Sequence, residues 1–173
     1  MSDPGDGAGT GVGSTPYDAV VVVASNRASA GVYEDRTGPL IVEALRAWGY
    51  AVPDPRVVPD GEPVAQALET AVAGGAAVVV TTGGTGISPT DATPEMTRRV
   101  IEREVPGVAE AIRAAGVAKG VPTAVLSRGL AGTVGTTFII NLPGSTGGVK
   151  DALTVLGPIL GHAVDQLRGG DHR

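Results

Sequence analysis

Short, continuous runs of valine, isoleucine, leucine and alanine recur along this chain, and segments with a helical spacing of apolar residues separate them. A continuous apolar run bounded by polar residues is typical of a strand buried on both faces of a sheet. Such runs cover Asp18–Ser25, Ala76–Thr82, Thr123–Ser127 and Thr137–Leu142, with a weaker extended segment at Tyr50–Val52 and Val57–Val58. Because strands alternate with amphipathic helices, the sequence predicts a three-layer α/β/α sandwich with a mostly parallel sheet.

The predicted helices begin at residues that favour helix starts. Thr37, Asp60 and Thr93 each precede a proline by one to three positions, the order of cap and first turn that is typical of a helix N-terminus. A further helix is expected at Pro106–Ala115. The loop from Asn26 to Arg36 is expected to carry no regular structure.

The last predicted helix runs from Val149 to Leu167. Pro158 lies inside it and is expected to kink or split it, because proline lacks the N–H that a helix interior needs. Apolar residues nearly encircle this helix, which favours burial against more than one surface and hence self-association.

The chain is expected to hold one domain at residues 17–168, between a Gly-rich tail at 1–16 and a short flexible C-terminus at 169–173. The N-terminal segment has neither the basic nor the apolar region of a signal peptide. No apolar run approaches the roughly 18–20 residues that cross a bilayer. With no cysteine in the sequence, we expect a cytoplasmic protein that does not associate with membranes.

Composition excludes several classes of function. A net charge of −5 and an aromatic content of 3% make nucleic-acid binding a poor hypothesis. Without cysteine there is no thiolate nucleophile, and His162 and His172 alone make a weak zinc site. The Gly-x-Ser-x-Gly pattern of α/β-hydrolases is absent.

Polar and glycine-rich segments follow the predicted strands at the edge where ligands bind in open α/β sheets. The segments are Ser25-Asn26-Arg27, Asp60, Thr81–Gly86 with Asp91, and Pro143–Ser145. A glycine loop can present successive backbone N–H groups to an anion, although a tight turn is an equal alternative. Asp60 and Asp91 have the alternative of capping helices. Arg27, Arg36 and Arg128 are more often structural or solvated than phosphate contacts.

Two carboxylates beside a phosphate-binding loop favour a magnesium–nucleotide site. Mg²⁺ typically takes one or two carboxylates together with phosphate oxygens and waters. Asp60 and Asp91 are therefore the candidate metal ligands.

Four segments together resemble a known family. They are Thr81–Glu95, Ser25–Arg36, Val58-Pro59-Asp60, and Leu126-Ser127-Arg128-Gly129 with Asn141–Ser145. In their order along the chain they are similar to the signatures of the MogA/MoaB family of molybdopterin-binding proteins in molybdenum-cofactor biosynthesis, and the resemblance covers residues 17–168.

The resemblance implies an activity: transfer of AMP from Mg-ATP to molybdopterin, with release of pyrophosphate. It places Asp60 and Asp91 at the two essential aspartates, as catalytic residues that hold Mg²⁺. Phosphate binding would fall to Ser25, Thr82, Gly83, Gly84, Thr85, Gly86, Pro143, Gly144 and Ser145. It further implies a homotrimer, with the molybdate-insertion enzyme as a possible partner.

Three positions depart from the family pattern. Asn26 stands where aspartate is common, Thr146 where proline is common, and Val134 where many members carry arginine. Two other functions remain open at this point: a non-catalytic molybdopterin-binding or carrier protein of the MoaB type, and a phosphate-binding domain for another nucleotide.

Overall fold

Six strands form one sheet at the centre of the computed structural model, which describes residues 16–170. The strand order is β2-β1-β3-β6-β5-β4. The parallel strands are β2 (Arg56–Val58), β1 (Ala19–Ala24), β3 (Val78–Thr82) and β6 (Thr137–Leu142). The antiparallel strands are β5 (Ala131–Val134), beside β6, and β4 (Arg103–Glu104) at the edge. The predicted mostly parallel sheet is confirmed.

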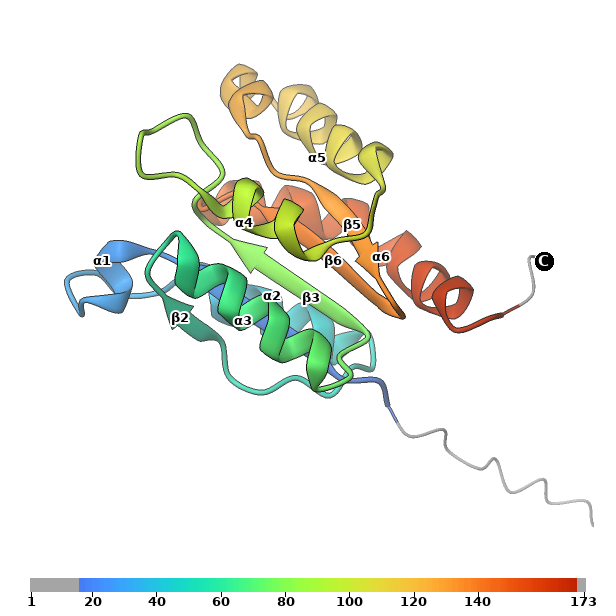
Figure 1. Cartoon of the computed structure of the whole chain (residues 1–173). Coiled ribbons are helices and arrows are strands. Elements are labelled where there is room, and N and C mark those ends of the chain that lie inside the picture. The colour runs from blue at the N-terminus through green and yellow to red at the C-terminus, as the bar shows by residue number, and fades with distance from the viewer. Residues whose placement is uncertain (1–15, 171–173) are drawn as a thin grey trace, which may run out of the picture.

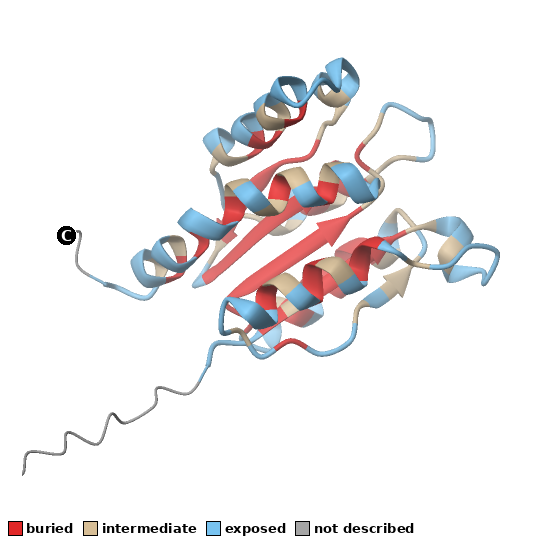
Figure 2. Ribbon diagram, turned by 180° about the vertical axis from the view of Figure 1, so that it is seen from behind, coloured by how far each residue is buried: buried red, intermediate tan, exposed pale blue. Residues whose placement is uncertain are grey.

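Helices cover both faces of this sheet (Figure 1). One face carries α2 (Thr37–Ala47), α5 (Pro106–Ala118) and α6 (Thr146–Leu167). The other carries α3 (Glu62–Ala73) and α4 (Thr93–Val100). The predicted three-layer α/β/α sandwich is confirmed, and Figure 2 shows that the buried residues lie along the strands and the inner helix faces.

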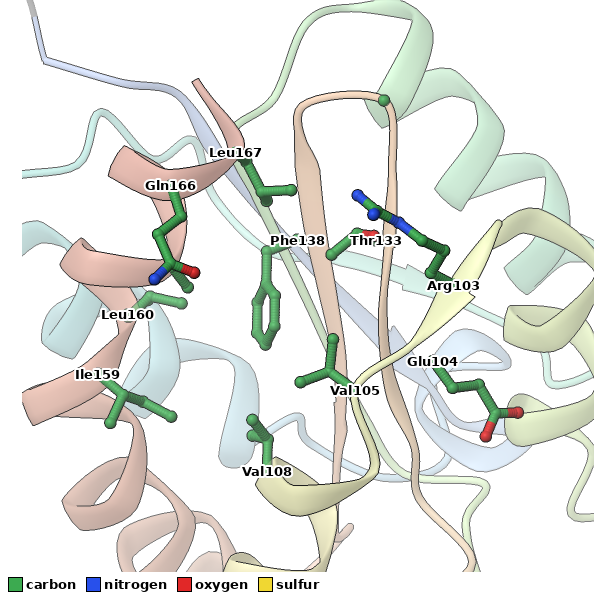
Figure 3. Close-up of a pocket in the computed structure, with 12 residues that line it drawn as sticks. Arg103, Glu104, Val105, Val108, Thr133, Phe138, Ile159, Leu160, Gln166 and Leu167 are labelled. Carbon is green, nitrogen blue, oxygen red and sulfur yellow. The ribbon is translucent and has the colours of Figure 1, made fainter. Parts of the chain in front are cut away.

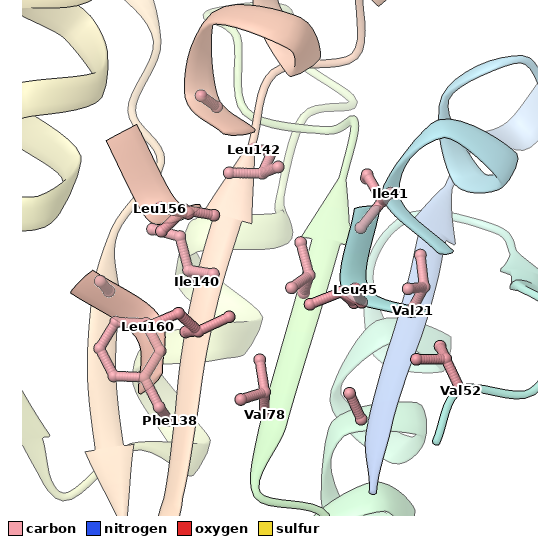
Figure 4. Close-up of a cluster of buried hydrophobic side chains, with 14 of the residues drawn as sticks. Val21, Ile41, Leu45, Val52, Val78, Phe138, Ile140, Leu142, Leu156 and Leu160 are labelled. Atoms are coloured by element: carbon pink, nitrogen blue, oxygen red, sulfur yellow. The ribbon is translucent and has the colours of Figure 1, made fainter. Parts of the chain in front are cut away.

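The core forms because successive residues of the central strands point to opposite faces. Val21, Val78 and Ile140 pack with Leu45 of α2 and Leu156 of α6 on one face (Figure 4). Val22, Val79 and Ile139 pack with Leu68 of α3 on the other. With both faces covered, β1, β3 and β6 read as continuous apolar runs instead of alternating ones.

The strand predicted at Thr123–Ser127 is wrong. Pro122–Leu126 forms a 3-10 helix, η1, in which Val125 is 61% exposed. The place beside β6 is taken by β5, in a segment where no strand was expected. A β-carbon on Gly132 would stand 2.6 Å from the Ile101 side chain, so this position of β5 requires glycine. Glycine has a weak strand propensity.

Three local predictions also change. Asn26–Ser29 forms a short helix, α1, inside the expected loop, with Ser25 as its cap. Asp35, and not Thr37, caps α2, because its Oδ1 accepts hydrogen bonds from the N–H groups of Thr37 and Gly38. Helix α6 continues past Pro158 without splitting.

The predicted tail at residues 1–16 falls almost entirely outside the described residues, as do the last three positions of the chain. The division into a tail and one domain therefore stays a prediction. Within residues 16–170, no helix is long and apolar enough to cross a membrane.

Candidate functional site

Two cavities open at the edge where the parallel strands β1, β3 and β6 end. The larger, of about 670 Å³, we call the glycine-loop cavity, and its polar lining includes Gly84, Thr85, Gly86, Asp91, Pro143, Gly144 and Ser145. The smaller, of about 400 Å³, we call the β1-end cavity, and its lining includes Ser25, Thr82, Gly83, Gly144 and Ser145. Every predicted site residue except Asp60 therefore lines one of the two cavities. Gly144 and Ser145 line both.

The glycine loop after β3 is held against the turn after β6. The Thr82 hydroxyl donates a 2.7 Å hydrogen bond to the carbonyl of Pro143, and the N–H of Gly83 donates to the carbonyl of Leu142 at 3.2 Å. Gly83 has a φ of +87°, and a β-carbon there would overlap the carbonyl oxygen of Ala24. Glycine is therefore required where these two segments and the end of β1 meet.

Asp60 lies behind the glycine loop and does not line either cavity. Its Oδ1 accepts hydrogen bonds from the N–H of Gly61 at 2.7 Å and from the hydroxyl of Thr93 at 3.1 Å. Its Oδ2 accepts the N–H of Ala92 at 3.1 Å. A β-carbon on Gly84 would overlap this carboxylate. The predicted capping of α3 is wrong, since the N-cap of α3 is Gly61 without a side-chain cap, and Asp60 binds the first turn of α4 instead.

The Asn26 side chain completes this arrangement. Its Oδ1 accepts the backbone N–H of Asp60 at 3.0 Å. An aspartate, which the family resemblance leads us to expect at this position, would offer the same kind of oxygen acceptor with one more negative charge beside Asp60.

Asp91 faces the glycine-loop cavity. Its Oδ2 accepts the N–H of Ser88 at 3.1 Å, while its Oδ1 accepts no hydrogen bond from residues 16–170. A β-carbon on Gly86 would stand 2.7 Å from Oδ2, so the loop and the carboxylate are in close contact. Asp60 and Asp91 therefore pack against two glycines of the same loop.

The Asp91 carboxylate fits Mg²⁺ bound together with phosphates, whereas Asp60 lines neither cavity. Asp91 lines the cavity and its Oδ1 accepts no hydrogen bond from residues 16–170, and Asp60 retains one lone pair on Oδ2 beyond the bond from Ala92. No group of three or more His, Cys, Asp or Glu side chains that could hold a metal occurs among the described residues. One or two carboxylates are what Mg²⁺ uses when substrate phosphates and waters complete its shell.

Helix α6 begins at the turn that the two cavities share. Ser145 caps it, since its Oγ accepts the N–H of Gly148 at 3.1 Å. The first N–H groups of a helix have no partner within the helix, and they carry the positive end of its dipole. Both cavities thus meet a surface that favours anions.

A buried polar network connects the sheet to Asp60. The Asn141 amide donates 2.9 Å hydrogen bonds to the hydroxyls of Thr81 and Thr97. Thr97 in turn donates to the carbonyl of Thr93 at 2.8 Å, and the Thr93 hydroxyl donates to Asp60. All four polar side chains between the sheet and Asp60 are at most 2% exposed. The position of Asp60 is thereby tied to the core.

Sequence reasoning missed the far wall of the glycine-loop cavity. Helix α5 and η1 supply it, with Ile112, Val121 and Leu126 among its apolar residues. The Arg113 guanidinium donates to the carbonyls of Ser127 and Gly129, which fixes the segment after η1. This wall was not predicted, because a central strand at Thr123–Ser127 would have placed those residues inside the sheet.

Arg128 is the structural one of the three loop arginines. Arg128 contacts the glycine loop and the Glu95 carboxylate. The Arg27 guanidinium instead lies 5.6 Å from the ring centroid of Tyr33. Arg36 lines the β1-end cavity. The hydrogen bond from Arg128 lowers the pKa of Glu95 below its ordinary value. The hydrogen bond to Glu95 raises the pKa of Arg128, and the charges of Asp91 and Asp60 also raise it.

A third cavity, of about 470 Å³, lies at the opposite end of the sheet (Figure 3). Phe138 of β6, Ile159 of α6 and Val108 of α5 line it, with Arg103 and Glu104 of the edge strand. None of the predicted site residues reaches it. The chemistry-bearing residues are therefore gathered at the other end of the sheet.

Comparison with known proteins places this chain among relatives of molybdenum-cofactor biosynthesis. The family model described as "Probable molybdopterin binding domain" matches residues 19–162. A molybdopterin adenylyltransferase from Helicobacter pylori strain J99 is 37% identical over 157 residues, covering 86% of each chain. This chain spans about half the length of the first curated relatives it matches, bifunctional proteins of molybdenum-cofactor biosynthesis from Synechococcus elongatus and Chlorobaculum tepidum.

Solved structures show the same fold. A structure described as "anomalous substructure of MogA" has a TM-score of 0.85 at 54% identity, covering 87% of this chain and 99% of its own. The molybdopterin biosynthesis Mog protein of Mycobacterium ulcerans has a TM-score of 0.83 at 51% identity, with the same coverage. On the match of the family model and of these relatives, the chain belongs to the MogA/MoaB family of molybdopterin-binding proteins.

Proposed function

We propose that this protein transfers AMP from Mg-ATP to the terminal phosphate of molybdopterin and releases pyrophosphate, as one step of molybdenum-cofactor biosynthesis. The observation that carries the proposal is the position of Asp91, which lines one cavity together with the glycine loop and the capped start of α6. Relatives that this chain covers over more than two thirds of their length are named molybdopterin adenylyltransferases, which supports the same activity.

Two phosphate-bearing ligands can meet at the turn Pro143–Ser145. Gly144 and Ser145 line both cavities, so a ligand in each would bring its phosphates to the N-terminus of α6. Thr82, Gly83, Gly84, Thr85 and Gly86 would bind the same phosphates through backbone N–H groups and hydroxyls. Ser25 would contribute from the β1-end cavity.

The reaction needs positioning more than acid–base chemistry. A terminal phosphate oxygen of molybdopterin attacks the α-phosphorus of ATP, a new P–O bond forms, and the bond from that phosphorus to the bridging oxygen breaks. The pyrophosphate leaves with the electron pair. Because the attacking phosphate is already an anion at neutral pH, no general base is required, and orientation and charge stabilisation supply the rate.

Asp91 and Asp60 are the proposed magnesium ligands. The metal, when bound, would neutralise charge that develops on the phosphate oxygens. Asp91 would bind it through Oδ1, which accepts no hydrogen bond from residues 16–170. Asp60 is hydrogen-bonded at both oxygens, so its larger contribution would be to hold the glycine loop and the start of α4 in place.

The family resemblance supports three further proposals. The protein would act as a homotrimer in the cytoplasm and would pass its product to the molybdate-insertion enzyme. In this structure, Ile159 of α6 is 37% exposed beside the cavity at the far end of the sheet, an apolar surface that self-association could bury. A monomer by light scattering at micromolar concentration would contradict the trimer.

The test of the proposed function is an assay of the purified chain with molybdopterin, ATP and Mg²⁺. Formation of adenylylated molybdopterin and an equal amount of pyrophosphate is the expected result. Tight pterin binding without product would indicate the non-catalytic carrier instead. Binding of nucleotide without binding of molybdopterin would indicate a phosphate-binding domain for another nucleotide.

A further inference from the structure

The loop that carries Asp91 has little support of its own. Ile87, Ser88, Pro89 and Thr90 are all exposed, and Ile87 is 68% exposed. Within the loop the N–H of Asp91 donates to the carbonyl of Ser88, and the N–H of Ser88 donates to Oδ2 of Asp91. These bonds close a small turn but do not connect it to the sheet.

Arg128 makes the connection. Its Nε donates to the carbonyl of Gly86 at 2.8 Å, and its Nη2 donates to the carbonyl of Asp91 at 3.0 Å. Its Nη1 forms an ion pair with Glu95 in the first turn of α4. Its backbone N–H donates to the carbonyl of Thr85 at 2.7 Å. One residue thus holds both ends of the exposed loop and the helix that follows it.

Only a guanidinium can make this set of contacts. Its donors lie in a rigid planar fork, so three acceptors at different angles are bound at once. A lysine ammonium would keep the positive charge near Asp91 and Asp60 but could not span two carbonyls and a carboxylate. Arg128 therefore acts here through the geometry of its guanidinium. Its N–H groups point at protein acceptors and not at a phosphate.

We propose that Arg128 is a positioning residue for the reaction, because its guanidinium fixes the Gly86–Asp91 loop and so the Asp91 carboxylate against the glycine-loop cavity. The inference rests on the proposed function. A protein without the Arg128 side chain would still fold and still contain the cavity. Its Gly86–Asp91 loop would no longer hold Asp91 where the phosphates react.

An arginine on α4, the helix that carries Glu95, provides a matched control. Arg99 of α4 forms a bidentate ion pair with Glu62 of α3, with Nη1–Oε2 and Nη2–Oε1 distances of 2.6 and 3.1 Å. This pair is half-exposed like the Arg128–Glu95 pair, but it contacts neither the glycine loop nor either cavity. Arg99→Met therefore removes a comparable surface ion pair without touching the loop.

The experiment compares Arg128→Met, Arg128→Lys and Arg99→Met in the AMP-transfer assay, with molybdopterin affinity measured separately by fluorescence. We expect both Arg128 variants to lower kcat by about a hundredfold, because displacement of a catalytic group by about 1 Å has that effect. Arg99→Met should stay within about twofold of the wild type. Recovery of kcat by Arg128→Lys would overturn the proposal, since it would show that only the charge matters. Equal effects of Arg128→Met and Arg99→Met would also overturn it.

A double-mutant cycle shows whether Arg128 acts through Asp91. If it does, adding Arg128→Met to Asp91→Asn should lower kcat by no more than about twofold further, whereas independent effects would multiply. Multiplied effects would contradict the positioning role. This readout separates positioning from a general loss of stability, which would affect both backgrounds alike.

Hydrogen exchange keeps the inference testable if the proposed function fails. The Ser88 and Asp91 amides should exchange faster in Arg128→Met than in the wild type by about tenfold or more, and should be unchanged in Arg99→Met. A wild type without AMP transfer would contradict the proposed function alone. Unchanged exchange at these two amides in Arg128→Met would contradict the inference alone.

Discussion

The backbone N–H of Ala92 donates a 3.1 Å hydrogen bond to Oδ2 of Asp60, which lies 32 positions earlier in the chain. Ala92 is the N-cap of α4 and has no side chain that could cap the helix. Asp60, two residues after β2, binds the Ala92 N–H and the Thr93 hydroxyl and so holds the start of α4. The glycine loop lies between these partners, so Asp60 joins three segments at the edge of the site.

Gly84→Ala should disrupt that junction. A β-carbon at this position would overlap the Asp60 carboxylate and the Thr93 hydroxyl, and the φ of +66° is unfavourable for alanine. We expect a loss of about 1–3 kcal/mol in the free energy of unfolding, measured in urea, together with loss of AMP transfer.

Gly161→Ala is the matched control for Gly84→Ala. Gly161 lies inside α6, and a β-carbon there meets nothing within 4 Å. Its replacement should raise stability by about 0.5–1 kcal/mol, because glycine is unfavourable in a helix interior. Equal stability changes at the two glycines would show that the contact with Asp60 does not constrain the loop.

Asn141→Ala should be strongly destabilising. Asn141 is 2% exposed, and its amide binds the Thr81 and Thr97 hydroxyls while its Oδ1 accepts the N–H of Leu130 at 3.2 Å. Removal would leave buried polar groups without partners, so we expect a loss of about 2–4 kcal/mol by urea unfolding. Thr70→Ala, which removes an exposed hydroxyl on α3, should change stability by less than about 0.5 kcal/mol.

Asp60→Asn should reduce both stability and turnover. The carboxylate accepts three hydrogen bonds in the structure, and an amide replaces one acceptor oxygen by a donor. We expect a loss of about 1–2 kcal/mol, similar to the loss of a helix cap, measured by chemical unfolding. Unchanged stability would contradict the role of Asp60 in holding the loop and α4.

The ion pair between Glu95 and Arg128 should make stability depend on pH. The hydrogen bond from Arg128 lowers the pKa of Glu95 in the folded protein, so the folded state favours the ionised carboxyl. The contribution is present above about pH 4.3, the ordinary glutamate pKa, and is lost as the pH falls through the lowered pKa. The stability difference between the wild type and Glu95→Gln should therefore shrink on acidification, and a difference that grows would contradict it.

The central strands could be predicted because their sequences depend on one property, burial on both faces. The valine runs of β1 and β3 and the isoleucines of β6 can fit only such a place. The edge of the sheet could not be predicted in this way. β5 contains Gly132, which is needed for a close approach to Ile101, and the more apolar Thr123–Ser127 segment follows Pro122 into a 3-10 turn.

The site was predictable where it is local in sequence. The glycine loop, Asp91 and the turn Pro143–Ser145 each consist of residues that are adjacent in the chain, and all of them line the cavities as expected. The supports of the site were not predictable, because they join distant segments. Arg128 binds Gly86 across 42 positions, and Asn26 binds Asp60 across 34. Neither contact leaves a periodic or spacing signal.

The most direct test of the account is AMP transfer by Asp91→Asn, measured together with molybdopterin binding. The substitution keeps the size of the side chain and removes the charge that the proposed magnesium site requires. We predict a fall in kcat of at least about a hundredfold, with pterin affinity within about twofold of the wild type. AMP transfer at the rate of the wild type would contradict the assignment of Asp91 and, with it, the proposed position of the active site.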